Sequence, residues 1–486
     1  MNAQIRRLAV ALIVMIVALM GALTYQQFFF APTLNAHPLN RRVTDAYWNQ
    51  ERGKIVTGDG ALVLAQSLPV GNGPEVTYAR NYPQGAKYAH ITGYFPAAIR
   101  GQMTDLEKAA EPILSGKADS QWMQRLQDLF TGAQPQAGNV SLTINPAVQD
   151  AMTAALSGKT GAAVALNPKT GEILGMASSP AFDPNALSGP DGNALQNTYN
   201  ALVADPQKPL LNRAISELYP PGSTFKIVTT AALLSHGTVA ADTIVDAPDT
   251  LDLPGTDVKL SNFAGESCGN GQVPLHKAFA LSCNTPFAAL GMQLGGEPLQ
   301  AQAKAFGFGT VPNVPLTGVA SEFPPPEAPS FLANAAIGQQ SVRVTPLQMA
   351  MVASAIANDG KTMTPYLINQ ELSSDFQVLK QYAPQVLSQA VSPEIAASIR
   401  QMMVEVVQSG TGKAAGIPGL NVAGKTGTAE TGVGRGLDQW FVGFAPAEDP
   451  RIAVAIVVED PQGVRGTGGT VAAPLARSIL QAGVSQ

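Results

Sequence analysis

The residues best suited to chemistry lie in the segment Pro220-Pro221-Gly222-Ser223-Thr224-Phe225-Lys226. Pro-Pro-Gly before a helical pattern places Ser223 in the first turn of a helix, where free backbone N–H groups favour a developing oxyanion. Lys226 follows one turn later, so both side chains share a helix face. A serine becomes a nucleophile when a neighbouring base takes its proton, and a lysine can be that base when burial or another cation lowers its pKa. Ser-x-x-Lys occurs once in the chain, yet alone it also fits a helix cap followed by a solvated lysine.

A second candidate is Ser282-Cys283-Asn284, the single Ser-x-Asn of the chain. It offers another hydroxyl, able to relay a proton, and an amide able to hold a substrate carbonyl or N–H group. The alternative interpretation is a polar turn after a helix that ends near Leu281.

The tripeptide Lys-Thr-Gly occurs three times, beginning at Lys159, Lys169 and Lys425. The first follows a helix, and the second forms a tight turn between two strands. Lys425-Thr426-Gly427-Thr428 instead ends an apolar strand, where the missing side chain of Gly427 would let a substrate add alongside. A lysine and two hydroxyls there suit a substrate carboxylate.

Hydrophobic periodicity predicts the elements that position these residues. Strands are expected near both ends of the region from residue 138 onward, with helices between them, which indicates one α/β domain whose sheet joins distant parts of the chain. The expected helices are 146–156 after the Asn145 cap, 223–235, 346–357 and 472–481, and the expected strands are 161–166, 172–177, 420–428, 439–445 and 451–459.

With 486 residues, the chain is long enough for two or three structural units. Gly58-Asp59-Gly60 is typical of a hairpin turn, Met103 to Phe130 predicts a helix, and Thr131 to Gly138 predicts a linker. We therefore expect a cytoplasmic tail at 1–7, a transmembrane anchor at 8–31, a small amino-terminal domain at 32–137 and the α/β domain at 138–486.

Leu8 to Ala31 contains no charged residue, and its length as a helix matches the hydrocarbon core of a bilayer. Arg6 and Arg7 precede it, which favours a cytoplasmic amino end. A cleaved signal peptide is the alternative, although Leu34-Asn35-Ala36 is a poor cleavage site. Both interpretations place the remaining chain outside the cytoplasm.

The composition excludes other classes of function. Apolar residues make up 45% and charged residues 13%, and the formal net charge is −5. A nucleic-acid-binding surface would leave a basic excess, so we expect no nucleic acid partner. Two cysteines and four histidines show no metal-ligand spacing, so neither a metal nor another cofactor is expected. The few histidines also disfavour a Ser-His-Asp triad.

The order of Ser-x-x-Lys, Ser-x-Asn and Lys-Thr-Gly resembles the signature of penicillin-binding proteins and serine β-lactamases. Further segments are similar to class B penicillin-binding proteins, with a compact amino-terminal unit that resembles the actinobacterial A-type. These segments are Glu51 to Ile55, Asn212 to Ala214, Tyr219 to Lys226, Ala336 to Gln340, Thr345 to Gln348, Ala357 to Gly360, Gly424 to Glu430 and Trp440 to Gly443.

The resemblance implies an antiparallel sheet flanked by helices, carried on a pedestal with a dimerisation-like fold. It implies that Ser223 attacks the penultimate D-alanine carbonyl of a peptidoglycan stem pentapeptide, with Lys226 as base, Ser282 as proton shuttle and Asn284 holding the donor peptide. Lys425 would support the electrostatics, Thr426, Gly427 and Thr428 would bind the substrate, and the backbone N–H groups of Ser223 and Thr428 would form the oxyanion hole.

The same resemblance implies a D,D-transpeptidase that cross-links stem peptides and is inhibited by β-lactams. It implies a single-pass protein of the cytoplasmic membrane with an extracytoplasmic catalytic domain. About 100 residues between helix and linker are too few for a glycosyltransferase domain, so a glycan polymerase of the elongation or division machinery is expected as partner.

Three questions stay open at this stage. Cys283 occupies the variable position of Ser-x-Asn, and outside the cytoplasm a disulfide with Cys268 is favoured over two buried thiols. A hydrolase, either a D,D-carboxypeptidase or a β-lactamase, carries the same three motifs, although Glu322 does not match the glutamate loop of a class A β-lactamase. A non-catalytic sensor or scaffold is the remaining alternative.

Overall fold

A computed structural model describes residues 2–35, 50–70, 77–96, 103–121, 136–189, 191–265, 267–431, 436–463 and 466–485. The predicted linker at Thr131 to Gly138 lies within these ranges only from Gln136 onward.

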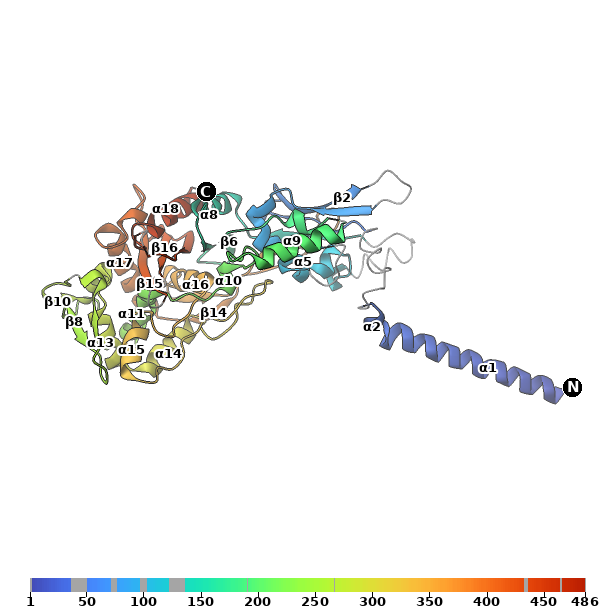
Figure 1. Cartoon of the computed structure of the whole chain (residues 1–486), viewed down its shortest axis with the longest axis horizontal. Helices are drawn as coiled ribbons and strands as arrows, with labels where there is room; N and C mark the ends of the chain where they lie inside the picture. Colours follow the sequence, from blue (N-terminus) through green and yellow to red (C-terminus); the bar gives the residue numbers. More distant parts are fainter. Residues whose placement is uncertain are drawn as a thin grey trace.

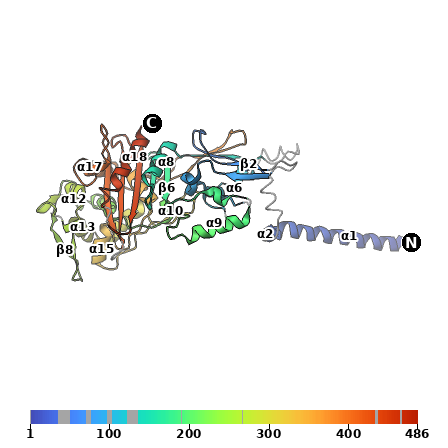
Figure 2. The same ribbon diagram turned by 45° about the horizontal axis from the view of Figure 1, so that its top comes forward.

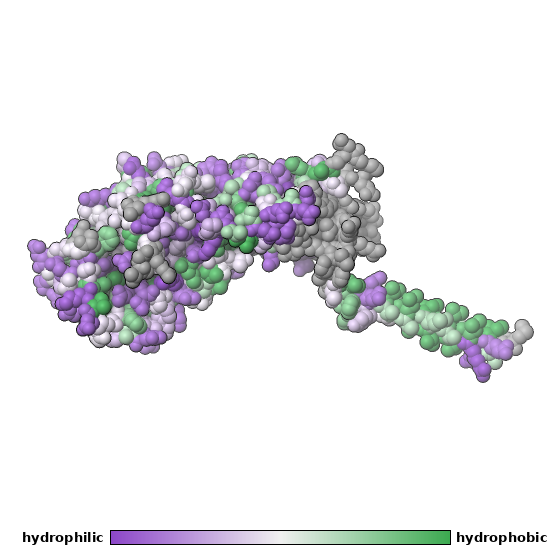
Figure 3. Space-filling model, in the orientation of Figure 1, coloured by the Kyte–Doolittle hydropathy of each residue, from purple (hydrophilic) through white to green (hydrophobic). Residues whose placement is uncertain are grey.

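The molecule is elongated, with one long helix projecting from the end opposite the catalytic motifs (Figure 1). Helix α1 spans Asn2–Thr24 and continues into the π-helical turn η1 at Tyr25–Phe29 and the short helix α2 at Ala31–Asn35. Within Ala3–Phe29, an 18-residue window has a mean hydropathy of 2.5 and is not buried against the protein, so this helix is long and apolar enough to cross a membrane. Its apolar surface runs along most of its length (Figure 3).

A six-stranded sheet forms the pedestal. Its strand order is β13-β12-β4-β1-β2-β3, and the predicted turn at Gly58 to Gly60 connects the antiparallel pair β1 and β2. Strands β4, β12 and β13 belong to the pedestal sheet although they follow residue 138 in the sequence. The pedestal and the α/β domain are therefore not two consecutive segments of the chain divided at residue 138. The bounds are β1 Ile55–Val56, β2 Val63–Val70, β3 Thr77–Asn81, β4 Asn139–Leu142, β12 Ile368–Leu372 and β13 Val378–Gln381.

The helical prediction for Met103 to Phe130 is confirmed only in part over its described residues. The structure has short helices instead: α5 at Asp105–Ala109, α6 at Glu111–Leu114 and the 3-10 turn η3 at Asp119–Gln121. Pro112 has no N–H to continue a helix from α5, and Gly116 adopts a positive φ of 75°. These two residues interrupt the expected helix.

A buried ion network stabilises the pedestal. The Glu107 carboxylate is fully buried and accepts hydrogen bonds from Arg52 Nε at 2.7 Å and from Arg80 Nε at 2.6 Å. Arg52 also pairs with Glu111. The two guanidinium groups hold the pKa of Glu107 below its usual value although burial opposes this.

The α/β domain is built on an antiparallel sheet of order β15-β16-β17-β5-β6. Alternate side chains of β16 and β17 pack on opposite faces, and both faces are buried: Trp440 and Val442 belong to one apolar cluster, Phe441 and Ile456 to the other. This explains why the sequences of these strands are continuously apolar and do not alternate between apolar and polar residues. The bounds are β5 Gly161–Leu166, β6 Ile173–Ser179, β15 Ala423–Glu430, β16 Leu437–Ala445 and β17 Ile452–Asp460.

Helix α16 covers one face of this sheet, and α8 and α18 cover the other (Figures 1 and 2). Helix α8 spans Pro146–Ala155 and begins where the Asn145 side chain accepts hydrogen bonds from Ala147 N and Val148 N, as predicted. Helix α16 spans Pro346–Ala357 and α18 spans Ala472–Val484. The predicted antiparallel sheet flanked by helices is confirmed.

The remaining elements of this domain form mainly a helical region between β6 and β15. Its helices are α9 Gly192–Ala204, α10 Arg213–Ser216, α11 Lys226–Ser235, α12 Leu275–Leu281, α13 Thr285–Leu294, α14 Gly296–Ala305, α15 Pro329–Ala336 and α17 Pro393–Gln408, and its short strands are β7 Ile244–Ala247, β8 Thr250–Asp252, β9 Lys259–Ser261, β10 Gly271–Pro274, β11 Lys361–Met363 and β14 Val386–Gln389.

We predict that Glu107→Gln lowers stability by about 3–5 kcal/mol, because it leaves the buried Arg80 guanidinium without its anion and leaves Arg52 with Glu111 alone. Calorimetry of the full chain in detergent should show a lower unfolding temperature. Since the native pKa of Glu107 is depressed, its stabilisation is complete at neutral pH and is lost as the pH falls through that pKa; the variant should lack this acid-dependent loss.

The matched control is Asp449→Asn, which breaks the exposed pair with Lys169 and should leave the unfolding temperature unchanged. Equal effects of the two variants would contradict the role assigned to Glu107.

Candidate active site

Ser223 lies in the 3-10 turn η5, Gly222–Phe225, which leads directly into α11. The predicted helix start is therefore confirmed, with a tighter first turn. The turn is fixed from two sides: Gly222 N donates to Gly338 O at 2.9 Å, and Trp440 Nε1 donates to Pro220 O at 3.0 Å. Ser223 itself is partly exposed, so its hydroxyl is accessible on a rigid support.

Gly427 allows this turn to pack against β15. A Cβ at Gly427 would lie 2.9 Å from Pro221 O and 3.0 Å from Thr224 Cγ2, closer than carbon atoms normally approach. The sequence suggested that the missing side chain makes room for a substrate, whereas in the structure this space is filled by the serine turn. Gly427 thus sets the distance between Ser223 and the Lys-Thr-Gly strand.

Lys226 is completely buried one turn after Ser223. Its Nζ donates to Ser282 O and to Asn284 Oδ1, each at 2.8 Å, and lies 5.5 Å from the centre of the Phe287 ring. Two of the three motifs therefore meet at this amine. In the described part of the chain the Ser223 hydroxyl makes no hydrogen bond, and such catalytic contacts often tighten only when substrate binds.

Lys425 is the second buried cation, and Ser282 joins it to the first. Lys425 Nζ donates to Ser282 Oγ at 2.7 Å and to Thr426 O at 3.0 Å. Ser282 has a left-handed backbone with φ of 63° at the carboxyl end of α12. Its carbonyl faces one lysine and its hydroxyl the other, so the structure brings all three motifs together.

The electrostatics of the two amines follow from this burial. Burial, and after it the positive charge of Lys425, lowers the pKa of Lys226 well below its usual value. Burial lowers the pKa of Lys425 to about 7. A buried amine next to another cation loses its proton readily, so Lys226 has the electrostatic environment that a lysine base requires.

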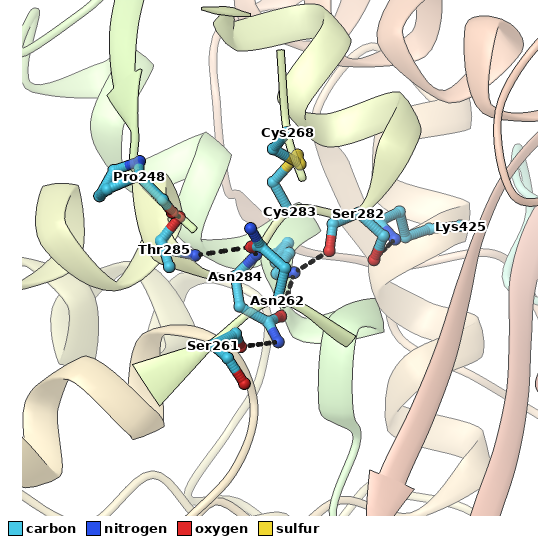
Figure 4. Close-up of a disulfide and its surroundings, with 10 residues drawn as sticks. Pro248, Ser261, Asn262, Cys268, Ser282, Cys283, Asn284, Thr285 and Lys425 are labelled. Atoms are coloured by element: carbon cyan, nitrogen blue, oxygen red, sulfur yellow. Dashed lines mark hydrogen bonds between the residues drawn. A yellow bond between two sulfur atoms is a disulfide. The ribbon is translucent and has the colours of Figure 1, made fainter. Parts of the chain in front are cut away.

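Hydrogen bonds and a disulfide hold Asn284 and its neighbours in place (Figure 4). The Asn284 side chain accepts from Lys226 and donates from Nδ2 to Ser261 O at 3.1 Å, so both ends of the amide are engaged within the protein. Cys283 is joined to Cys268 by a disulfide with a Cα–Cα distance of 6.2 Å. The disulfide ties the loop after η6, the 3-10 turn Phe263–Gly265, to the Ser-x-Asn motif.

Two contacts with residues of β15 were not predicted from the sequence. Thr411 Oγ1 lies 2.6 Å from Thr426 Oγ1, and Gly468 N donates to Thr428 Oγ1 at 3.1 Å. Thr411 follows α17 and Gly468 precedes α18, so neither carries a local signal in the sequence. Both orient the two threonines predicted to bind a carboxylate.

The other Lys-Thr-Gly segments and Glu322 take no part in this cluster. Lys159 Nζ donates to Ser157 O after α8, and Lys169, in the β5–β6 turn, pairs with Asp449. Glu322 is exposed, and its backbone pairs with that of Arg343. Among the described residues, no group of three or more His, Cys, Asp or Glu side chains could hold a metal ion.

Residues 161–481 match the penicillin binding protein transpeptidase domain, and residues 52–140 match the penicillin binding protein A dimerisation domain. The chain is 42% identical to the peptidoglycan D,D-transpeptidase PbpA of Mycolicibacterium smegmatis over the full length of both proteins, and 39% identical to that of Mycobacterium tuberculosis over 99% of each. The chain belongs to the penicillin-binding transpeptidase family.

The structure is also similar to that of penicillin-binding protein A from M. tuberculosis in its ceftriaxone acyl-enzyme complex, with a TM-score of 0.85 and 38% identity over 91% of this chain and 100% of that one. An imipenem acyl-enzyme complex of the same protein matches with a TM-score of 0.84. The resemblance to class B penicillin-binding proteins of the A-type is thereby confirmed, and the protein is a serine acyl-transfer enzyme.

We predict that Gly427→Ala displaces the serine turn, because the new Cβ would press on the Pro221 carbonyl. Overpacking of this kind costs about 1–3 kcal/mol and should also slow acylation by penicillin. The control is Gly189→Ala, where a Cβ meets nothing within 4 Å. Unchanged acylation and melting of Gly427→Ala would contradict this packing argument.

Proposed function

We propose that Ser223 performs D,D-transpeptidation by attacking the penultimate D-alanine carbonyl of a stem pentapeptide, with Lys226 as its base. The observation that carries this proposal is the meeting of two buried lysines at Ser282, one of which, Lys226, lies one helical turn after the partly exposed Ser223. No histidine is needed for this arrangement.

The hydrogen bonds of Lys226 support its role as base. A neutral amine has two N–H groups and one lone pair, and here two acceptors, Ser282 O and Asn284 Oδ1, occupy the two N–H groups. The lone pair then remains for the Ser223 proton. As Oγ bonds to the carbonyl carbon, the proton passes to Lys226 and the carbonyl oxygen becomes an oxyanion.

Ser282 is suited to carry the proton onward. Its Oγ accepts a hydrogen bond from Lys425, so its own O–H is free to donate to the leaving amine. Lys226 contacts Ser282 at the carbonyl oxygen, so its ammonium group would turn to the neighbouring hydroxyl to replace the proton that Ser282 gives up. The carbon–nitrogen bond then breaks, and D-alanine leaves with a protonated amine. The products are free D-alanine and a Ser223 ester of the shortened peptide.

We assign the remaining roles to β15 and the serine turn. The backbone N–H groups of Ser223 and Thr428 would stabilise the oxyanion, a contribution of about 3 kcal/mol per donor in comparable sites. Thr426 and Thr428, with the charge of Lys425 nearby, would bind the substrate carboxylate, and Asn284 would hold the donor peptide while it orients Lys226. An amine of a second stem peptide then attacks the ester and forms the cross-link. β-Lactams would acylate the same hydroxyl.

We further propose that α1 anchors the enzyme in the cytoplasmic membrane with the catalytic domain outside. Arg6 and Arg7 near the start of α1 and the Cys268–Cys283 disulfide support this topology. The dimerisation-domain match occupies the region between α1 and the transpeptidase domain, so a separate polymerase of the division or elongation machinery would supply the glycan strands.

The proposal is tested by intact mass of the full chain in detergent, with and without benzylpenicillin. We expect one adduct, on the peptide containing Ser223, that persists for many minutes, and no adduct in Ser223→Ala. Rapid steady turnover of a chromogenic cephalosporin would indicate a hydrolase instead. Labelling of Ser223→Ala equal to wild type would exclude Ser223 as nucleophile.

We predict that the acylation rate constant rises with pH as Lys226 loses its proton and falls above about pH 7 as Lys425 becomes neutral. Lys425→Met removes the neighbouring charge, so the pKa of Lys226 should increase. The rising limb of the plot of acylation rate constant against pH should then move to higher pH. Stopped-flow acylation between pH 5 and 9 (roughly the range in which these groups titrate) measures this shift. Lys304→Met on the exposed face of α14 is the control, and an unmoved rising limb in Lys425→Met would refute the coupling.

A further inference from the structure

Pro248, the hairpin β8–β9 and the residues that follow this hairpin lie against the Ser-x-Asn motif. Four hydrogen bonds and a disulfide join them: Ser261 O accepts from Asn284 Nδ2, Asn262 Oδ1 accepts from two backbone N–H groups, Pro248 O accepts from Thr285 Oγ1, and Cys268 is bonded to Cys283 (Figure 4). The motif is thus held by a segment that carries none of the three family motifs.

Asn284 occupies the N-cap position of α13, and its side chain does not cap that helix. An asparagine at this position ordinarily turns its carbonyl oxygen back onto the N–H groups of the first helical turn. Here the side chain points away, toward Lys226 Nζ and Ser261 O. Something else must therefore satisfy the start of the helix.

Asn262, 22 residues earlier in the chain, does so. Its Oδ1 accepts from Asn284 N at 2.8 Å and from Thr285 N at 3.2 Å. Pro286, the next residue, has no N–H, so few donors remain at this helix end for the Asn284 side chain. Asn262 is 4% exposed, and its own Nδ2 has no partner among the described residues, so the carbonyl oxygen makes its contacts.

We propose that Asn262 is a positioning residue for the acylation step: by capping α13 it keeps the Asn284 amide turned toward Lys226. This inference rests on the proposed role of Lys226 as base. Without the Asn262 oxygen, the backbone N–H groups of Asn284 and Thr285 lose their acceptor, so the backbone that directs the Asn284 side chain toward Lys226 is no longer fixed. Lys226 then loses one of its two acceptors, and its lone pair is no longer directed by two fixed hydrogen bonds.

The test measures acylation by benzylpenicillin in the full chain in detergent, separating the rate constant of bond formation from the affinity of the preceding complex. Asn262→Ala should lower the rate constant about tenfold or more, because a misplaced base is costly, with affinity nearly unchanged. Asn262→Asp retains an acceptor for both N–H groups and places a negative charge at a helix start. It should keep the rate constant within about threefold of wild type.

Two further variants separate positioning from simple loss of stability. Asn145→Ala also removes an asparagine that caps two N–H groups, at α8; it should lower the melting temperature comparably and leave the rate constant unchanged. In an Asn284→Ala background, Asn262→Ala should have no further effect on the rate constant, since coupled residues are not additive.

The inference is overturned if Asn262→Ala acylates at the wild-type rate, if Asn262→Asp is as slow as Asn262→Ala, or if the two asparagine substitutions act additively. Should wild type itself form no Ser223 adduct, the proposed function fails first, so the two failures are distinguishable. If Asn262→Ala does not fold, the comparison of Asn262→Asp with wild type and the pH profile of its acylation still decide the matter: its charge should move the rising limb to higher pH, and an unmoved limb with a slowed rate would contradict the proposal.

Discussion

The site depends on holding two lysine amines in the protein interior on either side of one serine. Ser282 contacts Lys226 through its carbonyl and Lys425 through its hydroxyl. Two buried ammonium groups that contact the same serine repel each other and are poorly solvated. The pKa of at least one of them is therefore lowered, and it loses its proton easily. The fold must therefore hold α11, the turn after α12 and β15 rigidly together, because small displacements would let water in and restore ordinary lysine behaviour.

Glycines and aromatic groups provide that rigidity. Gly427 lets the serine turn lie directly on β15, and Gly338, with φ of 76°, approaches so closely that a Cβ would lie 2.1 Å from Gly222 O. The rings of Phe287 and Phe279 lie beside the two lysine amines. These rings exclude water while offering a weakly favourable face to a cation, so the amines are desolvated without being left in a purely aliphatic environment.

Sequence predicted the local parts of the site well. The helical spacing of Ser223 and Lys226, the Asn145 cap and the continuous apolar strands each follow from short-range rules that tertiary packing did not override. The order of the motifs along the chain, and the family resemblance that this order supports, distinguished Lys425 from the two other Lys-Thr-Gly segments. Asn262 and Thr411 were not predicted, because their partners lie 22 and 15 residues away, beyond the reach of short-range rules, and each sits in a segment without periodicity. The pedestal was predicted less well: Pro112 and Gly116 broke an expected helix, and β12 and β13 joined a sheet begun some 300 residues earlier, a pairing that no local signal encodes.

The environment of Trp440 has an optical consequence. Its indole is fully buried, donates to Pro220 O and stands edge-on to the Tyr219 ring with centroids 5.9 Å apart. Both neighbours lie immediately before the turn that carries the nucleophile. Because indole emission responds to its hydrogen bond and to nearby dipoles, this tryptophan is an intrinsic fluorophore placed at the base of the reacting loop, and covalent occupancy of the serine should be readable in ultraviolet light without a label.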